Sequence, residues 1–157
     1  MFPTDMAPAG FTIDEVANTI RFVRDLDAPP MRVFAAWTEP EQLAQWWDPA
    51  GEKLGVCEID LQPGGAFRFA TSHHPDKPFT GVYHEIAPPT LLVFEANGAM
   101  GKVMLAARAG GTRMTVEIVC RSPDHLAQFM ATGVATGTSR TLDNLASHLR
   151  NAQVSVA

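Results

Sequence analysis

The sequence predicts an α+β domain in which one curved antiparallel sheet of about seven strands carries its helices on a single face. Most of the chain between residues 51 and 121 shows the period-two alternation that is typical of strands. Two short helical patterns follow the first strand, and only Ser122–Arg150 has the length and apolar spacing of a long helix. Helices set apart from a run of antiparallel strands indicate this class, with the other sheet face exposed to water.

The N-terminal part contains the first predicted strand. Residues 1–15 are rich in Pro, Ala and Gly, and we expect them to form a flexible lead-in. Residues 16–26 follow with apolar side chains at even spacing, which predicts a strand. Pro29 and Pro30 end it, because proline cannot continue a ladder of backbone hydrogen bonds.

Two short helices are predicted next. Pro30 suits the first position of a helix whose apolar face holds Val33, Phe34 and Trp37. Residues 38–41 then read as a capping box.

In that box, Thr38 would cap the second helix and Glu41 would bond back to it, with Pro40 in the first turn. This helix carries Trp46 and Trp47 before the residues Asp-Pro-Ala-Gly end it.

Six more strands are predicted from alternation and turn residues. The predicted ranges are 56–61, 66–72, 80–86, 91–96, 101–108 and 112–121. Pro63–Gly65 fits a tight turn between the first two of these strands. Gly110 and Gly111 are predicted to form the two-residue primed turn of the last hairpin.

The C-terminal helix begins with clear signals and contains a weak point. Ser122 suits the N-cap position and Pro123 the first helical position. The apolar residues before and after Gly133 and Gly137 point in directions that differ by about 120–130° at about 100° per residue. We therefore expect a short helix to about residue 131 and a longer one to about residue 150. A continuous helix whose two glycines allow close packing is the alternative.

Length, charge and cysteine content exclude several classes of function. The 157 residues fit one domain, placed at residues 16–150 with a C-terminal tail at 151–157. A net charge of −5 with scattered basic residues argues against nucleic-acid binding. No apolar run approaches a membrane span and no secretory signal is evident, so we expect a cytoplasmic protein that does not bind membranes. Cys57 and Cys120 are expected to be free thiols, with a disulfide as the alternative.

Several motifs in order resemble a known family. Residues 28–49 contain Ala-Pro, Trp-Thr, Pro-Glu and Trp-Trp pairs at the spacing found at the start of Hsp90-ATPase-activator-like (AHSA1-like) domains. Residues 60–68 resemble the family pattern D-L-x-P-G-G-x-F-R, and residues 81–89 resemble G-x-x-x-E-I-x-P-P. Gly111-Thr112 and the glycines and leucines of residues 133–145 are similar to the end of the family pattern.

The resemblance implies the helix-grip fold of the START/Bet v 1-like (SRPBCC) superfamily, with a cavity between the sheet and the C-terminal helix. It does not imply one activity, because related members bind lipids, hormones or polyketides, some are cyclases, and the family name comes from a co-chaperone domain. Some members carry Trp where this chain has Thr138. We expect Thr138 on the inner face of the helix, with its hydroxyl bonded to the carbonyl one turn earlier or, less favoured, presented to a ligand.

Large apolar side chains supply the candidate ligand-binding residues. The alternative is that they are core residues, which aromatic side chains at such spacing more often are. The candidates are Trp47, Phe67, Phe69, Tyr83, Phe94, Phe129, Met130 and Thr138.

Groups able to catalyse a reaction or to bind a metal are weakly indicated. His73 and His74 are adjacent, so in a strand-like segment they point opposite ways and rarely bind one ion together. Glu58 and Glu117 lie at the parity opposite to the apolar side chains, so we expect both to face water. The strands also hold Asp60, Glu85 and Glu95. We expect no metal, no cofactor and no catalytic residue.

The preferred hypothesis is non-enzymatic binding of a small, mainly apolar molecule in the cavity. A protein-interaction module that acts on a chaperone or regulator, for instance in a stress response, is the second hypothesis. A cyclase or hydrolase acting in the same cavity is the third, and it would need a titratable group inside. Self-association as a homodimer stays open.

Overall fold

The computed structural model describes residues 10–156, with side chains described up to residue 151. Within that range the chain forms one eight-stranded sheet and four helices. The strands are β1 (Thr12–Asp14), β2 (Thr19–Leu26), β3 (Leu54–Ile59), β4 (Ala66–Thr71), β5 (Phe79–Ala87), β6 (Leu91–Ala96), β7 (Ala99–Arg108) and β8 (Gly111–Val119). The helices are α1 (Pro30–Thr38), α2 (Pro40–Trp46), α3 (Pro123–Ala131) and α4 (Val134–Val156).

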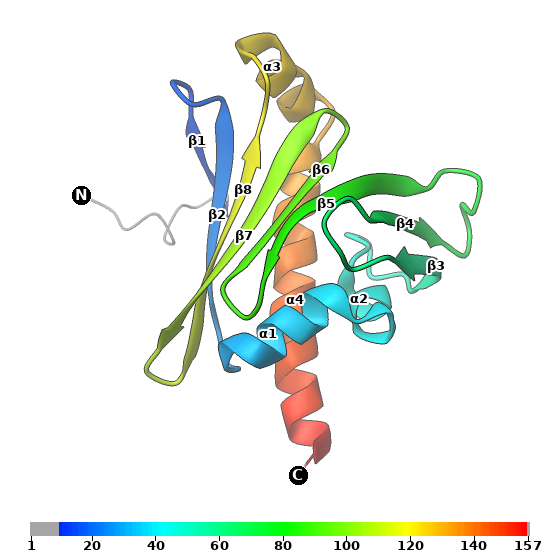
Figure 1. Cartoon of the computed structure of the whole chain (residues 1–157), viewed down its shortest axis with the longest axis vertical. Helices are drawn as coiled ribbons and strands as arrows, with labels where there is room; N and C mark the ends of the chain where they lie inside the picture. The colour runs from blue at the N-terminus through cyan, green and yellow to red at the C-terminus, as the bar shows by residue number, and fades with distance from the viewer. Residues whose placement is uncertain (1–9, 157) are drawn as a thin grey trace.

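The sheet is antiparallel throughout and curves around α4. Its strand order is β1-β2-β8-β7-β6-β5-β4-β3, so the first long strand pairs with the last. Figure 1 shows α4 running along one face of the sheet, with α1 and α2 crossing near its C-terminal half and α3 at the opposite end. This is the helix-grip arrangement that the resemblance implied, with one strand more than expected.

The additional strand lies inside the expected lead-in. Thr12–Asp14 pairs with the start of β2, where residues 1–15 were expected to be flexible. The turn that follows is held by Asp14, whose Oδ1 accepts hydrogen bonds from the backbone N–H groups of Val16 and Ala17 at 3.1 Å. β2 therefore begins at Thr19 and not at Val16. Residues 1–9 lie outside the described part of the chain.

The predicted capping box at α2 is wrong. Thr38 is the last residue of α1, and its hydroxyl donates a hydrogen bond to the carbonyl of Phe34 at 2.9 Å. Glu39 takes the N-cap position instead, without a side-chain capping bond. A threonine that is still helical bonds backwards along its own helix and is not free to cap the next one. Pro40 occupies the start of α2 as expected.

The last hairpin is shifted by one residue. Its loop is Ala109–Gly110, since Gly111 already pairs with Arg108 in the ladder. Gly110 has a φ of 84° whereas Ala109 has no positive φ, so the expected primed turn is not formed. Gly111 serves packing: a Cβ there would lie 1.9 Å from the carbonyl oxygen of Leu26. The other predicted strands after residue 51 agree with the structure to within two residues at either end.

The expected break in the C-terminal helix is confirmed. α3 ends at Ala131 and α4 begins at Val134, and Gly133 between them has a φ of 82°. Ser122 caps α3 by accepting a hydrogen bond from the backbone N–H of His125 at 3.1 Å. α4 continues past the expected end at Arg150, because residues 151–156 contain neither glycine nor proline to stop it.

The main core lies between the sheet and α4. The apolar stripe of α4 is buried, and the helix packs against β2, α1 and α2. The largest fully buried side chains of this layer are Ile20, Phe22, Met114, Leu142, Leu145 and Leu149. This stripe fixes α4 against the sheet along its C-terminal half, and the N-terminal half is left to border a different space.

Candidate functional site

A cavity of about 400 Å³ lies between the concave face of the sheet and the first turns of α4. Strands β6, β7 and β8 form one wall, α4 and the α3–α4 turn form another, and the end of α2 and the residues after it close the side. It is lined by Trp37, Trp47, Pro49, Phe79, Phe94, Ala96, Asn97, Ala99, Gly101, Val116, Ile118, Phe129, Thr132, Gly133, Val134, Gly137, Thr138, Thr141 and Leu142. Its size is that of a small-molecule site.

Glycines in the sheet determine where the aromatic rings of this wall lie. Gly101 is paired across the ladder with Phe94, and a Cβ on Gly101 would lie 2.5 Å from the Phe94 ring. Gly81 stands in the same relation to Phe67, at 2.3 Å. Each ring therefore lies over the glycine of the neighbouring strand. This keeps the Phe94 ring close to the sheet and leaves space between the sheet and α4.

Hydrogen bonds from α4 hold the wall formed by the end of α2. The hydroxyl of Thr141 donates to the carbonyl of Trp47 at 3.0 Å, and the amide of Asn144 donates to the carbonyl of Asp48 at 2.9 Å. Pro49 then lies against Gly137, where an added Cβ would be 3.7 Å from the proline ring. The position of Trp47 beside the cavity is thus fixed by polar contacts that a sequence pattern does not reveal.

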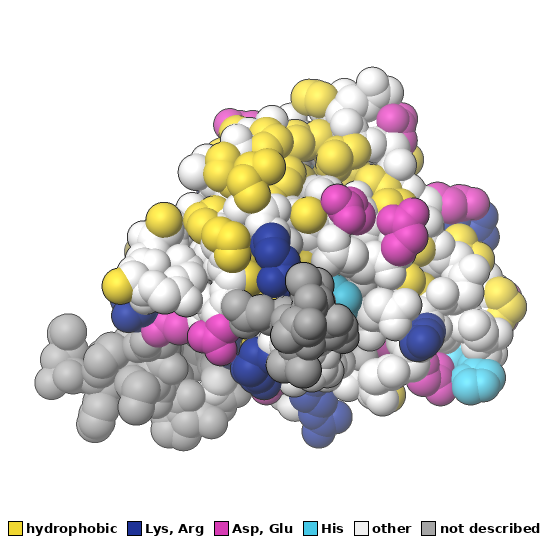
Figure 2. All heavy atoms as spheres, turned by 90° about the horizontal axis from the view of Figure 1, so that it is seen from below, with side chains coloured by type: hydrophobic (Ala, Val, Ile, Leu, Met, Phe, Trp, Pro, Cys, Tyr) yellow, Lys and Arg dark blue, Asp and Glu magenta, His cyan; other side chains and the backbone are white. Residues whose placement is uncertain are grey.

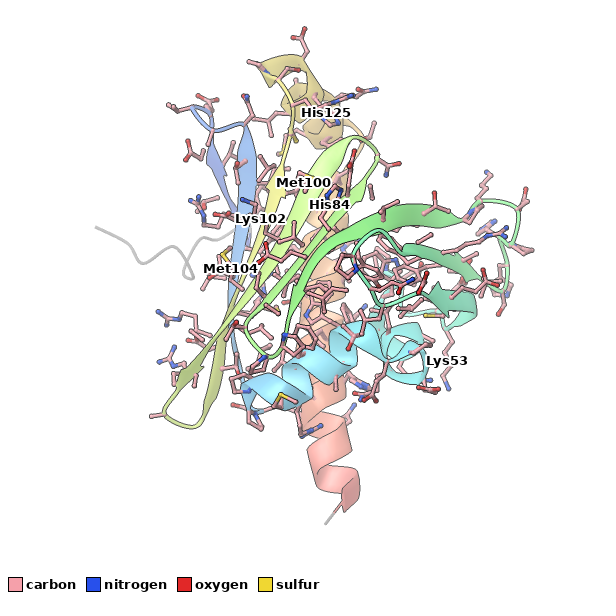
Figure 3. All side chains as sticks on the ribbon, in the orientation of Figure 1. Lys53, His84, Met100, Lys102, Met104 and His125 are labelled. Carbon is pink, nitrogen blue, oxygen red and sulfur yellow. The ribbon has the colours of Figure 1, made fainter. Side chains whose placement is uncertain are left out.

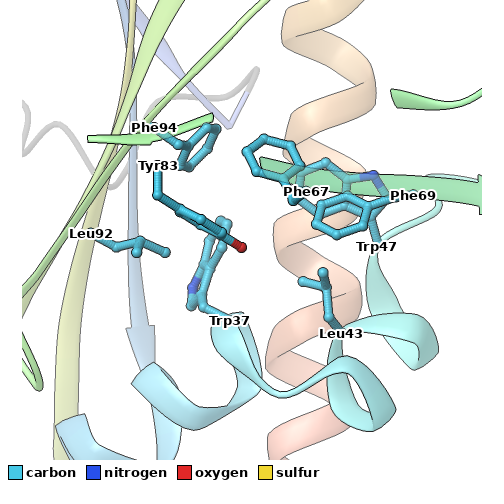
Figure 4. Close-up of a pocket in the computed structure, with 8 residues that line it drawn as sticks. All are labelled: Trp37, Leu43, Trp47, Phe67, Phe69, Tyr83, Leu92 and Phe94. Carbon is cyan, nitrogen blue, oxygen red and sulfur yellow. The ribbon is translucent and has the colours of Figure 1, made fainter. Parts of the chain in front are cut away.

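A packed aromatic cluster adjoins the cavity and shares Trp37, Trp47 and Phe94 with it. The rings of Phe67 and Phe69 are stacked at 4.9 Å, and Trp47 meets Phe69 edge-on at 5.1 Å. Figure 4 shows these side chains facing one another around a narrow space. That space is only about 10 Å³, which is room for about one water molecule.

The structure divides the eight predicted site residues into three groups. Trp47, Phe94, Phe129 and Thr138 line the cavity. The aromatic cluster beside it contains Phe67, Phe69 and Tyr83, which have almost no free space before them. Met130 lies away from both, in an outer groove that is lined by α3 and the β1–β2 turn. The sequence grouped Met130 with Phe129 because both contribute to the apolar direction of the short helix before Gly133.

Sequence reasoning missed several wall residues. Val116 and Ile118 share the parity of the apolar side chains of β8, so their inward orientation was available from the alternation. Gly101 and Gly137 gave no signal, because a glycine without a side chain carries no periodicity. Thr141 lies on the helical face of Thr138, but its bond to the loop after α2 depends on the tertiary structure.

Thr138 lies on the inner face of α4 as expected, and it lines the cavity. The expected hydrogen bond from its hydroxyl to the backbone carbonyl one turn earlier is not formed. Among the described residues, the Thr138 side chain makes no hydrogen bond. The neighbouring hydroxyls of Thr132 and Thr141 do bond to backbone carbonyls, at 2.9 and 3.0 Å. Thr138 thus presents an unpartnered hydroxyl at the cavity wall.

No ionisable side chain lines the cavity among the described residues. Burial raises the pKa of the Cys57 thiol to about 11, with Glu41 adding to the shift, and burial raises the pKa of Tyr83 well above its usual value. Both groups are thus protonated near neutral pH and are poor nucleophiles or bases. The two thiols are free, as expected.

The strand carboxylates and the paired histidines lie outside the cavity. Glu58 is exposed, and Glu117 bonds to Arg21 at 2.7 Å on the outer face of the sheet. Figure 3 places Met100, Lys102 and Met104 on that same outer face of β7. His73 is in the exposed turn after β4, with its Nδ1 2.8 Å from Glu52. The described residues contain no group of His, Cys, Asp or Glu side chains arranged to hold a metal ion.

Comparison with protein families assigns the chain. Residues 27–150 match the family model described as activator of Hsp90 ATPase homolog 1-like protein. The chain belongs to the AHSA1-like family. Its helix-grip fold also fits the wider SRPBCC superfamily. No protein of curated function matches the sequence of this AHSA1-like chain.

Solved structures of bacterial proteins share the fold. A Nitrosomonas europaea protein is 23% identical with a TM-score of 0.78, and the match covers 87% of this chain and 96% of the other. A Mycobacterium smegmatis protein is 22% identical with a TM-score of 0.78, over 90% and 97% of the two chains. An AHSA1-like protein of Aeromonas hydrophila is 24% identical with a TM-score of 0.72, over 86% and 94%. At identities this low, the solved structures support only the fold of this AHSA1-like chain. In the part of the chain searched, no helix is long and apolar enough to cross a membrane.

Proposed function

We propose that this AHSA1-like chain binds a small, mainly apolar molecule in the cavity between the sheet and α4. The cavity itself carries the proposal. Its volume of about 400 Å³ lies within the range of small-molecule sites, and its wall is built mainly of aromatic and aliphatic side chains with a few hydroxyls and one amide. Filling such a space with an apolar ligand removes apolar surface from water. The favourable free energy of this burial is about 25 cal/mol per Å².

The experiment combines ligand screening with a variant that fills the cavity. Native mass spectrometry and thermal shift measured with a panel of uncharged aromatic compounds and medium-chain lipids are expected to detect binding. In Thr138→Trp the indole occupies the cavity, so we expect ligand binding to be lost while the melting temperature stays the same or rises. A melting temperature that falls by several degrees would show a tightly packed site instead, because overpacking costs about 1–3 kcal/mol.

Thr136→Trp is the matched control. Thr136 lies two residues away on the exposed side of the same helix, so the same substitution there leaves the cavity open. Ligand binding should survive in this variant. Equal loss of binding in both variants would show that the effect comes from the helix and not from the cavity, and failure of every compound to bind the unaltered protein would overturn the proposal.

The enzyme hypothesis receives no support from the cavity. General acid–base catalysis needs a titratable group within hydrogen-bond reach of the substrate. The wall offers hydroxyls, one amide and indoles, and the raised pKa values of Cys57 and Tyr83 lie far from the neutral range that such catalysis favours.

A partner-binding role has a weaker basis. Figure 2 looks onto the end of the molecule at which α4 ends, and hydrophobic side chains form a band across the upper part of that view with acidic side chains beside them. The large exposed hydrophobic residues are nonetheless spread over separate elements: Ile13, Val16, Met31, Leu61 and Val82. Single exposed apolar residues are common on protein surfaces. Size-exclusion chromatography with light scattering would test self-association, and a chaperone or regulator as partner would have to be sought in pull-down experiments.

A further inference from the structure

The hydroxyl groups of the cavity wall are gathered on one side. The first turns of α4 and the turn before it contribute Thr132, Thr138 and Thr141. The facing wall of the sheet consists of apolar side chains and a glycine, apart from Asn97 at its exposed edge. A molecule in the cavity therefore meets an apolar surface on the sheet side and hydroxyl groups on the helix side.

Thr138 has the hydroxyl of this row that can still donate a hydrogen bond. Thr132 and Thr141 already donate to backbone carbonyls, at 2.9 and 3.0 Å. Thr138 makes no side-chain hydrogen bond, and its oxygen is not among the buried polar atoms without a partner, which in the described residues are Asn18 Oδ1 and Trp37 Nε1. The Thr138 oxygen is therefore open to the cavity, where it can donate one hydrogen bond and accept others.

Two other wall groups also keep a free donor. The Nε1–H of Trp47 has no acceptor among the described residues and is not buried. The side chain of Asn97 lies on the exposed turn between β6 and β7, where water can bond to it. Both groups belong to other walls of the cavity than Thr138, so their variants serve as comparisons in the test.

Burial along α4 shows which end of the cavity is closed. Gly133 at the α3–α4 turn is exposed, Thr138 is half-buried and Leu142 has no exposed surface, and all three line the cavity. The space thus opens near the turn and ends against the core. Thr138 lies between these ends, so a ligand that extends to Leu142 carries an apolar end inward beyond the Thr138 hydroxyl.

The wall holds no charge to balance an ion. Among the described residues that line the cavity there is no Lys, Arg or His and no Asp or Glu. An ion removed from water without a partner is strongly disfavoured, whereas a neutral oxygen needs only one donor. The wall around Thr138 therefore favours an uncharged group.

We propose that the ligand is an uncharged, largely apolar ring compound with one neutral oxygen that accepts a hydrogen bond from the Thr138 hydroxyl. This inference rests on the proposed function, and it adds the chemical class of the ligand, its orientation and the residue that selects it. Apolar contacts with the sheet and with the closed end supply the main part of the affinity. Thr138 supplies the preference for an oxygen at the middle of the cavity.

Two probes that differ only at the oxygen test the proposal. 1-Tetralone and tetralin share one fused ring skeleton, and the carbonyl of the ketone replaces a methylene of the hydrocarbon. Both dissociation constants are measured by NMR titration in the unaltered protein and in each variant. Comparing the changes caused by a substitution cancels the different cost of removing the two probes from water.

Thr138→Val removes the hydroxyl and keeps the branched shape. The ketone should then bind about three- to tenfold more weakly, which is the usual worth of one hydrogen bond, while tetralin should bind at least as well as before. In Thr138→Ser the hydroxyl remains, so the ratio of the two affinities should stay that of the unaltered protein. Thr136→Val, on the exposed side of α4, is the matched control and should change neither affinity.

Trp47→Phe and Asn97→Gly test the other two free donors. Glycine suits position 97 because its φ is 53°. The ratio of ketone to hydrocarbon affinity should persist in both variants, even where each affinity changes. A ratio that falls in one of them and survives in Thr138→Val would show that another donor selects the oxygen, and the proposal would be overturned.

The infrared C=O band of bound 1-tetralone gives a readout that a merely structural role of Thr138 would not move. A hydrogen bond lowers the wavenumber of this band. We expect a lower wavenumber in the unaltered protein and in Thr138→Ser than in Thr138→Val. One band position in all three proteins would contradict the proposed bond.

A third probe tests the charge of the ligand. Tetralin-1-carboxylate should bind more weakly than tetralin, and tighter binding than that of the ketone would overturn the uncharged class. An equal effect of Thr138→Val on ketone and hydrocarbon would overturn this inference and leave the proposed function standing, since both probes still bind. If neither probe binds the unaltered protein, this inference fails, and the proposed function fails with it only if the wider panel of compounds also shows no binding.

Discussion

Gly101 shows how a single hydrogen atom in place of a side chain sets the shape of the cavity. Because it has no Cβ, the ring of Phe94 on the neighbouring strand lies over its backbone. The same pairing of Gly81 with Phe67 occurs farther along the sheet, where other rings fill the space in front. One residue type in two places thus gives an open cavity in one and a packed cluster in the other.

Gly101→Ala should therefore reduce the cavity from the sheet side. The new Cβ would lie 2.5 Å from the Phe94 ring, so the ring has to swing toward α4. We expect destabilisation of about 1–3 kcal/mol in chemical denaturation and weaker binding of any cavity ligand. Ligand affinity equal to that of the unaltered protein would show that Phe94 yields in another direction.

His148 gives the fold a dependence on pH. It lies on α4, its Nε2 donates to the side-chain carbonyl of Gln42 at 3.2 Å, and burial followed by the charge of Arg32 lowers its pKa below the ordinary 6.5. The unfolded chain then binds a proton more readily than the folded one. This contribution to stability is complete above pH 6.5 and is lost as the pH falls from there toward the lowered pKa of the folded state.

The test is a comparison of unfolding free energies between pH 7.5 and about pH 5 by urea denaturation. The unaltered protein should lose more stability over this interval than His148→Gln, whose amide does not titrate. Parallel curves for the two proteins would assign the pH dependence to other groups.

The site residues show which facts a sequence holds and which it does not. Thr138 could be placed on the inner face of α4 from helical spacing alone, and Phe94 could be named as a large side chain of an inward parity. That Phe67 packs while Phe94 borders open space depends on which other rings arrive from α1 and α2. The role of Thr141 depends on a single hydrogen bond that forms only in the folded chain.

The two glycines of the C-terminal region have different roles. Gly133 separates α3 from α4, and Gly137 lies inside α4. Gly133 has a φ of 82°, which a residue with a Cβ adopts at a cost. Gly137 is within α4 and has helical backbone geometry, with only Pro49 near its missing Cβ. Sequence reasoning could not assign different roles to the two glycines, since only their backbone angles distinguish them.

Alanine substitutions at these two glycines should act in opposite directions. Gly133→Ala should destabilise the protein by about 1–2 kcal/mol because of the strained φ. Gly137→Ala should stabilise it by about 0.5–1 kcal/mol, since alanine favours the helix and 3.7 Å is an ordinary contact. Thermal and urea denaturation of both variants measure this. Destabilisation by Gly137→Ala would mean that Pro49 cannot accept even a methyl group.

The elements that sequence reasoning found are those with strong local signals. The break near Gly133 followed from two apolar stripes that point in different directions, and the Ser122 cap followed from residue type. β1 was missed because a three-residue strand is too short to show alternation. Thr38 was assigned to the wrong helix because a capping residue and a last-turn threonine look the same until the helix end is known.

At the scale of the whole molecule, the sheet and α4 enclose both the packed core and the cavity. Large aliphatic side chains bury the C-terminal half of the helix, which packs against β2, α1 and α2, while the N-terminal half borders the cavity. The free space thus lies beside the main core and not within it. The family fold could be predicted as a whole, because its motifs are spread over nearly the full chain.

The pairing of β2 with β8 has a consequence for the order of events during synthesis. Arg21 and Glu117, whose side chains meet across these strands, are 96 residues apart in the chain. Closing so long a loop is entropically costly, and proteins dominated by such distant pairings fold slowly. During synthesis, β2 lacks its partner β8 until most of the domain has been made, and α4 follows β8 in the chain. The nascent chain therefore has no enclosed cavity until α4 has been made and has docked on the sheet.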